Sequence, residues 1–301
     1  MPSSPPPAVD AAWPAAMSAA LAATGGGGPP PRVWLDLGTS AKTLAKWDVQ
    51  HNSSLIVVGV DPVLSNVQHA SQPTTPRFVR VHGACTEGPP STATLLIHKS
   101  VTCASLMPTH ARAPKLGTGS DACTGDVPVP MRVPTFPLRL LLRRMTKALA
   151  PRVELLKIDV QGSELACLRS AGAELQHVDN LLLEVQDADE GSGLLMYEGA
   201  PSLTELDALL QEHGLRRQYC EWNIFSKSVR EINCLYSRVG HGHGSRAARL
   251  WATGNFQRGG SMVSYDNPPR FVRPPQILRK LKTSRFAGER VARSGGGRWF
   301  W

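Results

Sequence analysis

Four carboxylates follow strand-like runs of apolar residues, where an α/β protein places groups that contact a ligand. Asp36 and Asp61 lie at the ends of "RVWLDLG" and "LIVVGVDP", Asp159 lies near the end of "VELLKIDV", and Glu184 lies near the end of "NLLLEV". Ligands of an open parallel sheet bind beyond the carboxyl ends of its strands. One such acid alone fits a helix N-cap or a loop contact equally well. Because buried acids cost free energy without a partner, the set of four predicts a ligand site at this edge.

Asp61 indicates what kind of ligand this is. An acid that ends the second strand can accept hydrogen bonds from both hydroxyls of a ribose, and Asp61 lies 23 residues after Gly38, near the usual spacing of about 20. The turn "DLGTSAKT" contains Gly38 as its single glycine, so the phosphate-binding GxGxxG pattern is absent. A dinucleotide, and with it a nicotinamide-dependent dehydrogenase, is therefore disfavoured. A nucleoside cofactor without phosphates, such as S-adenosylmethionine, makes less demand on this loop.

The elements that must position these acids alternate between strand and helix patterns. Short apolar runs predict strands, and apolar residues at helical spacing between them predict helices. The predicted strands are 32–38, 55–62, 77–83, 153–160, 180–185, 215–222 and 230–238, and the predicted helices are 39–47, 63–70, 163–172 and 202–214. This alternation predicts an α/β fold with a doubly wound, mostly parallel sheet covered on both faces.

The stretch "LLKIDVQGSELACLRSAG" resembles the characteristic motif of the FkbM-type methyltransferases, whose usual form is close to LLKIDVEGAELEVLRGA. The resemblance extends in order from Val33 to about Arg238. "WLDLGTS" is similar to the loop after the family's first strand, "VVGVDPVLSN" to the acid–proline turn after its second, and "LLLEVQ" to its fifth strand. The resemblance implies a class I methyltransferase (Rossmann-like) fold. It also implies that S-adenosylmethionine donates a methyl group to an oxygen of a small molecule or sugar.

The resemblance also implies roles for individual residues. It assigns to the cofactor a set of residues near the first two strands: Asp36, Gly38, Ser40 and Asp61. It places a second set beside the transferred methyl and the acceptor, where Asp159 would orient or deprotonate an acceptor hydroxyl: Asp159, Gln161 and Glu164.

The sequence departs from the family pattern at three of its positions. Ser40 stands where the family has asparagine, Lys42 where it has a second loop glycine, and Gln161 where it has glutamate. These departures bear on cofactor affinity and turnover.

Composition divides the chain into a folded part with two irregular ends. Residues 1–31, rich in Ala, Pro and Gly, predict a disordered lead with no core element, although 15–23 has the composition of a short helix. Residues 32–240 predict the methyltransferase-like domain, interrupted by an insertion or lid at 99–126. Residues 241–301 predict a disordered basic tail, with 12 Lys and Arg against 2 Asp and Glu, while the rest of the chain has 21 against 22.

The tail leaves a second hypothesis open: a catalytically weakened relative that binds nucleic acid or an acidic partner through it. Weak contact with anionic lipid is also compatible with its charge, whereas no apolar run approaches the roughly 20 residues of a membrane span.

The six cysteines show no CxxC pair and no metal-like spacing with histidine. We therefore expect reduced thiols, no metal site and a cytoplasmic location, with organelle targeting still open. The expected partner is a small-molecule or sugar acceptor.

Overall fold

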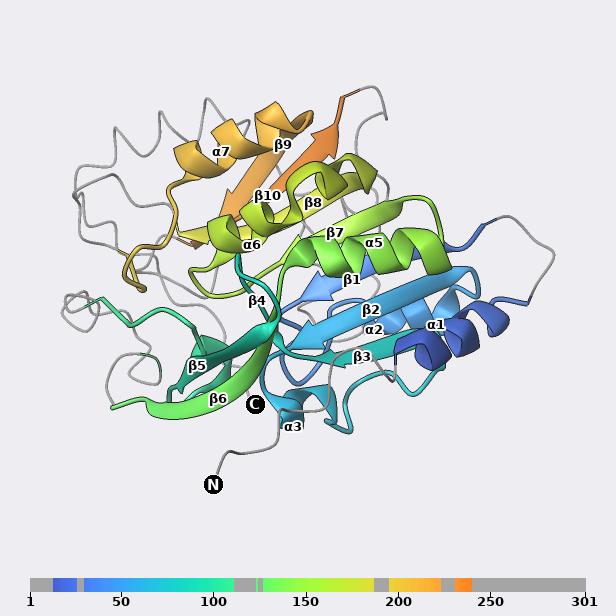
Figure 1. Cartoon of the computed structure of the whole chain (residues 1–301), viewed down its shortest axis with the longest axis horizontal. Helices are drawn as coiled ribbons and strands as arrows, with labels where there is room; N and C mark the ends of the chain where they lie inside the picture. The colour runs from blue at the N-terminus through green and yellow to red at the C-terminus, as the bar shows by residue number, and fades with distance from the viewer. Residues whose placement is uncertain are drawn as a thin grey trace, which may run out of the picture.

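A computed structural model describes residues 13–25, 30–110, 123, 127–186, 195–222 and 231–239 (Figure 1). The remainder of the predicted lead, most of the predicted insertion and the whole predicted basic tail lie outside the described residues. The boundaries expected for the domain therefore remain predictions.

A seven-stranded sheet forms the centre of the described chain, in the order β3-β2-β1-β7-β8-β10-β9. Its strands are β1 (Arg32–Leu37), β2 (Leu55–Asp61), β3 (Phe78–His82), β7 (Val153–Ile158), β8 (Val178–Gln186), β9 (Leu215–Trp222) and β10 (Glu231–Arg238). The pairs from β3 to β8 are parallel, and β10 runs antiparallel to both neighbours. The predicted α/β, doubly wound, mostly parallel fold is confirmed, and the order reverses between β1 and β7.

Helices cover both faces of this sheet (Figure 1). One hydrophobic core contains buried residues of α1 (Trp13–Ala22), α5 (Leu138–Ala148), α6 (Glu164–Ala171) and α7 (Leu203–Glu212), and the other contains Val49 of α2 (Lys46–His51). The part of the chain that the structure describes also contains the short helix α3 (Leu64–Val67) and the 3-10 helices η1 (Val101–Cys103) and η3 (Gly172–His177). Apolar strands such as β2, which is buried along its full length, require this cover on both sides.

The N-terminal helix α1 corrects one expectation. Trp13, Met17 and Ala20 are buried and belong to the main core, so this part of residues 1–31 is an ordered core element. The expectation of a lead without core elements is wrong for these residues. The Ala-rich composition indicated the helix. The composition did not indicate that this helix packs into the main core.

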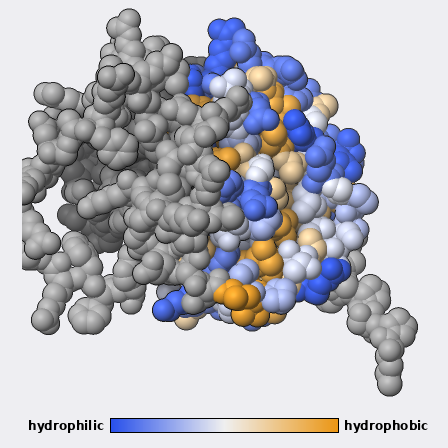
Figure 2. All heavy atoms as spheres, turned by 90° about the vertical axis from the view of Figure 1, so that its left-hand side faces the viewer, coloured by the Kyte–Doolittle hydropathy of each residue, from blue (hydrophilic) through white to orange (hydrophobic). Residues whose placement is uncertain are grey.

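A small second sheet has the order β4-β6-β5, formed by β4 (Ala84–Cys85), β5 (Ser91–Ile97) and β6 (Val129–Phe136). Figure 2 shows the side of the molecule that lies on the left in Figure 1. On its described part, hydrophobic residues form a band between hydrophilic ones. Exposed large apolar side chains among the described residues include Val127 and Val129 near the start of β6. Exposed apolar side chains are common on folded proteins, so these two alone indicate no site.

All six cysteines form disulfides, so the expectation of reduced thiols is wrong. The pairs join β4 to α6 (Cys85–Cys167), η1 to residue 123 (Cys103–Cys123), and facing positions of β9 and β10 (Cys220–Cys234). The fold brings cysteines that are distant in sequence together, and their spacing in the sequence did not predict these pairs. Disulfides persist mainly in oxidising compartments. The expected cytoplasmic location was based on reduced thiols, so the cysteines no longer support it. Across the described residues, no helix has the length and apolar character needed to cross a membrane.

Candidate active site

The site lies where the sheet order reverses, between the ends of β1 and β7. Gly38 follows β1 with φ of +80°, and a Cβ added to it would lie 1.9 Å from the carbonyl oxygen of Asp159. Only glycine permits this approach. The Asp159 N–H donates to the Leu37 carbonyl at 3.2 Å, which holds the two strand ends together.

A lysine joins the acids at this point. The Lys157 ammonium lies 3.3 Å from Asp36 Oδ1 and 3.2 Å from Asp159 Oδ2, and it donates to the Gly38 carbonyl at 3.0 Å. The side chain of Asp36 has no exposed surface, and its second oxygen accepts a 2.5 Å hydrogen bond from the Thr43 hydroxyl. Burial alone would lower the pKa of Lys157, but the surrounding carboxylates raise it, so the lysine stays charged.

Asp159 has a lowered pKa despite its burial. Burial opposes its ionisation, while the charge of Lys157 and side-chain hydrogen bonds with Glu184 and Gln161 favour it. A carboxylate with a lowered pKa is a weak proton acceptor. Asp159 is therefore suited to hold or orient a positively charged or hydrogen-bonding group.

Asp61 lies at the end of β2 and is already engaged by the protein. It accepts hydrogen bonds from the backbone N–H groups of Ser40 and Val63, both at 2.8 Å, and from the Asn66 amide at 3.1 Å. Burial raises the pKa of Asp61, and the same three hydrogen bonds oppose that rise. Oδ2 accepts one of the three bonds and Oδ1 accepts two, so Oδ2 can take a further donor.

The loop after β1 is folded around these groups. The predicted helix over 39–47 is wrong for most of its length, because α2 begins at Lys46 and residues 39–45 form a loop. Gln72, itself buried, donates to the Ser40 carbonyl at 2.9 Å and accepts from the Thr43 N–H at 3.0 Å. Lys42, which stands in place of the family glycine, is exposed in this loop.

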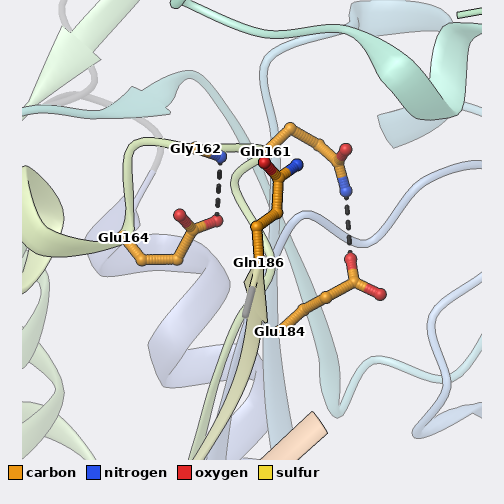
Figure 3. Close-up of a pocket in the computed structure, with 5 residues that line it drawn as sticks. All are labelled: Gln161, Gly162, Glu164, Glu184 and Gln186. Atoms are coloured by element: carbon orange, nitrogen blue, oxygen red, sulfur yellow. Dashed lines mark hydrogen bonds between the residues drawn. The ribbon is translucent and has the colours of Figure 1, made fainter. Parts of the chain in front are cut away.

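A small recess opens beside the end of β8 (Figure 3). Five residues line it: Gln161, Gly162, Glu164, Glu184 and Gln186. Glu164 Oε1 accepts from the N–H groups of Val160 and Gly162 at 3.2 and 3.1 Å. Burial, with a smaller contribution from the charge of Asp159, raises the pKa of Glu164 to about 7.

The structure therefore divides the predicted site residues into two groups. Asp159, Gln161 and Glu164 gather at the end of β7, and Gly38, Ser40 and Asp61 gather at the ends of β1 and β2. Asp36 lies beneath both groups without reaching the surface.

Lys157, Gln72 and Tyr197 were not among the predicted site residues; the Tyr197 hydroxyl lies 2.8 Å from the Gln161 amide oxygen. Lys157 stands between the apolar residues Leu156 and Ile158, and that position was the available sign of a buried charged group. Gln72 and Tyr197 follow no such pattern. Among the described residues, no group of His, Cys, Asp and Glu has an arrangement that could hold a metal ion.

Solved structures similar to this chain include several methyltransferases. A TehB-like SAM-dependent methyltransferase from Corynebacterium glutamicum is 9% identical, with 74% of this chain and 87% of that chain covered and a TM-score of 0.35. Magnesium protoporphyrin IX methyltransferase from Synechocystis PCC 6803 with bound SAM is 12% identical, with 74% and 78% covered and a TM-score of 0.34. The antibiotic-resistance methyltransferase Kmr is 13% identical, with 75% and 93% covered and a TM-score of 0.37. These scores carry no argument, and the fold assignment rests on the strand order of the chain itself.

A comparison with curated proteins gives no significant match. The family model described as the methyltransferase FkbM domain, however, matches residues 38–217, which is more than half of the chain and includes both groups of site residues. The predicted family is confirmed: the chain belongs to the FkbM methyltransferase family.

Proposed function

We propose that this protein transfers a methyl group from S-adenosylmethionine to a hydroxyl oxygen of a small molecule or sugar. The observation that carries the proposal is the juxtaposition, at the point where the sheet order reverses, of an acidic cluster and the acid that ends β2. In the described part of the chain, the cluster contains three carboxyl groups around the ammonium of Lys157: Asp36, Asp159 and Glu184.

The residues fit this cofactor in both of its halves. An excess of carboxyl groups over ammonium groups favours a ligand that carries positive charge, as the sulfonium and amino groups of S-adenosylmethionine do. Asp61 Oδ2, which accepts one hydrogen bond from the Ser40 N–H, can accept a second from a ribose hydroxyl. Gly38 allows the backbone to approach a ligand closely.

Each protein group then has a defined task. Asp61 binds the ribose, Ser40 orients Asp61, and Asp159 faces the cationic part of the cofactor. Asp36 acts from below as a positioning residue, since it holds Lys157 and Thr43. The bound cofactor supplies an electrophilic methyl group.

Glu164 is the residue best suited to accept the proton of the acceptor hydroxyl. It lines the recess, and a carboxyl whose pKa is raised to about 7 takes up a proton near neutral pH more readily than Asp159 does. Formation of the new carbon–oxygen bond would break the methyl–sulfur bond of the donor, with its electron pair left on sulfur, and the proton of the acceptor hydroxyl would pass to Glu164. Asp159 orients the reacting groups, so this proposal keeps the first of the two roles considered for it.

The recess has room for about one water-sized group, so its lining bears on a single hydroxyl of the acceptor. Two carboxyl groups, Glu164 and Glu184, and two amides, Gln161 and Gln186, offer several acceptors and donors at close quarters. Such a lining suits hydroxyl groups better than an apolar surface. The family match lends no support to the alternative of a nucleic-acid binder that acts through its basic tail.

Calorimetric titration of the full chain with S-adenosylmethionine tests the proposal. We expect a dissociation constant on the order of micromolar for the wild type, and a loss of about tenfold or more in Asp61→Asn, which puts an amide where the ribose needs a carboxylate. The matched control is Asp179→Asn, because Asp179 lies near the beginning of β8 and pairs with Arg152 instead. No binding by a folded wild-type protein would overturn the proposal, as would equal binding by both variants.

A further inference from the structure

The side chain of Gln161 bridges two carboxyl groups of the site. Its amide nitrogen donates to Asp159 Oδ1 at 2.8 Å and to Glu184 Oε2 at 3.0 Å, the second of which is drawn in Figure 3. Its amide oxygen accepts a 2.8 Å hydrogen bond from the Tyr197 hydroxyl. The amide thus spans β7, β8 and the segment that contains Tyr197.

We propose that Gln161 is a positioning residue that holds Asp159 and Glu184 as a pair, and that Tyr197 fixes the direction in which its amide faces. The bridge itself follows from the contacts alone. It rests on the proposed function only in the assumption that this carboxyl pair faces S-adenosylmethionine.

The chemistry of the three partners allows one orientation of the amide. A primary amide has two N–H donors at one end and an acceptor at the other, whereas an unprotonated carboxyl oxygen only accepts. The Tyr197 hydroxyl donates to the amide oxygen of Gln161. This contact directs both N–H groups of the amide toward Asp159 and Glu184. A reversed amide would place oxygen against carboxylate oxygen.

Tyr197 is held firmly enough to set this orientation. It is fully buried, and a Cβ added to Gly162 would lie 2.9 Å from the Tyr197 Cβ, so the ring packs directly against that glycine. Its hydroxyl is also within 3.2 Å of the Cys103 carbonyl. On the backbone side, Gln161 has a left-handed φ of 53°, and its carbonyl accepts a 2.6 Å hydrogen bond from Ser105.

The bridge gives a reason for the departure from the family pattern. Glutamate at position 161 would bring a third carboxyl group against Asp159 and Glu184, in a region that also contains Asp36 and Glu164. Among the described residues, the ammonium of Lys157 is the positive charge that favours ionised Asp159. Glutamine supplies two donors without charge, so the change adds a function to the site and does not damage it.

Three variants of the full chain test the bridge: Gln161→Glu, Tyr197→Phe and the matched control Tyr236→Phe. Tyr236 is also buried and also loses one hydrogen bond, to Asp207 at 2.8 Å, but it lies on β10 outside the site. For each variant, the thermal midpoint is measured from about pH 5 to about pH 8, and the dissociation constant of S-adenosylmethionine is measured by calorimetry over the same range.

We expect Tyr197→Phe and Tyr236→Phe to lower the midpoint by similar amounts, roughly 2–4 °C. Tyr197→Phe alone should weaken S-adenosylmethionine by about tenfold and change the pH profile of binding. In Gln161→Glu the carboxyl neighbours raise the pKa of the new carboxyl above its unfolded value of about 4.3. Its contribution to stability is therefore complete at low pH and lost as the pH rises, so the deficit against wild type grows toward pH 8.

Two results would overturn the inference. One is a Gln161→Glu variant that melts like the wild type at every pH. The other is a pair of tyrosine variants with the same dissociation constant and the same pH profile. If the wild type itself does not bind S-adenosylmethionine, the proposed function fails, while the melting curves of Gln161→Glu still decide whether the bridge exists.

Discussion

The loops after β1 and β7 meet at the same edge of the sheet, but different chemistry holds each of them. Both contain a non-glycine residue in the left-handed conformation, Ser40 in one and Gln161 in the other, each with φ of 53°. Such a residue costs about 1 kcal/mol or more, and it persists when its surroundings determine it. The loop after β1 is determined mainly through its backbone, because the N–H groups of Ser40 and Thr43 donate to Asp61 and Gln72.

The loop after β7 also has backbone donors, since the N–H groups of Val160 and Gly162 donate to Glu164, but a side chain makes its contacts to the other carboxyl groups. The Gln161 amide makes the contacts to Asp159 and Glu184, and Lys157 supplies the opposing charge. Backbone donors are present whatever the residue type, whereas side-chain donors are lost by substitution. The two departures in the loop after β1, at Ser40 and Lys42, are therefore compatible with function, and the departure at Gln161 has the larger chemical effect.

Replacement of Lys157 by methionine would disturb both loops and should have the largest effect. The lysine side chain is 7% exposed and contacts Asp36, Asp159 and the Gly38 carbonyl, so its loss leaves two carboxylates without their cation. We expect the free energy of unfolding, measured by urea denaturation, to fall by about 3–5 kcal/mol. Lys147→Met, on the exposed end of α5, is the control and should change it by less than about 0.5 kcal/mol.

The pH dependence of Lys157→Met sharpens this prediction. Without the ammonium, the folded-state pKa of Asp159 rises, so the folded variant binds more protons than the wild type does. Its stability deficit should therefore shrink as the pH falls, because a protonated carboxyl needs no cation. A deficit that is small at neutral pH, or that grows on acidification, would show that Lys157 does not join the two loops.

The sheet and the positions of the acids could be predicted from the sequence because both depend on strong local patterns. The apolar run of β2 and the acid that ends it, Asp61, identify a buried strand and the edge of the sheet to which its carboxyl end points. The partners of that acid depend on tertiary contacts. Ser40 reaches Asp61 across 21 residues, and Gln72 reaches Ser40 across 32, and neither spacing is a recognisable pattern.

The disulfides and the loop over 39–45 were mispredicted for the same physical reason. Cys85 and Cys167 are 82 residues apart and meet because β4 and α6 pack together. The helical composition of 39–47 was overridden by contacts from Asp61, Asp36 and Gln72. Local propensity differs by less than about 1 kcal/mol per residue, which several buried hydrogen bonds exceed.

Glu164→Gln should have an intermediate effect on stability, and this effect should be confined to the loop after β7. The pKa of Glu164 is raised from 4.5 to about 7 by burial, so the folded wild type loses stability as the pH rises through that window. Glutamine keeps an oxygen for the N–H groups of Val160 and Gly162 and never ionises. The variant should gain on the wild type by about 1.4 kcal/mol for each pKa unit of the shift, measured by urea denaturation.

The same variant should lose methyl transfer by a factor of about 10² to 10⁴, because it cannot accept a proton. Higher stability with lower activity would place Glu164 in the chemistry. A stability difference that does not change between about pH 4.5 and about pH 8 would mean that Glu164 does not ionise as a buried group.

Restoring glycine at Lys42 should have the smallest effect, and it tests the comparison from the backbone side. Lys42 is exposed, and the loop around it is fixed by Ser40 and Thr43, so the lysine side chain has little to contribute. Lys42→Gly should lower the free energy of unfolding by about 0.4–1 kcal/mol, because glycine adds freedom to the unfolded chain. The dissociation constant of Lys42→Gly for S-adenosylmethionine should stay within about threefold of wild type.

Lys42→Ala is the control, because it removes the lysine side chain without adding the backbone freedom of glycine. A tenfold gain in affinity in both variants would mean that the lysine obstructs the cofactor. The loop after β1 would then depend on its side chains after all.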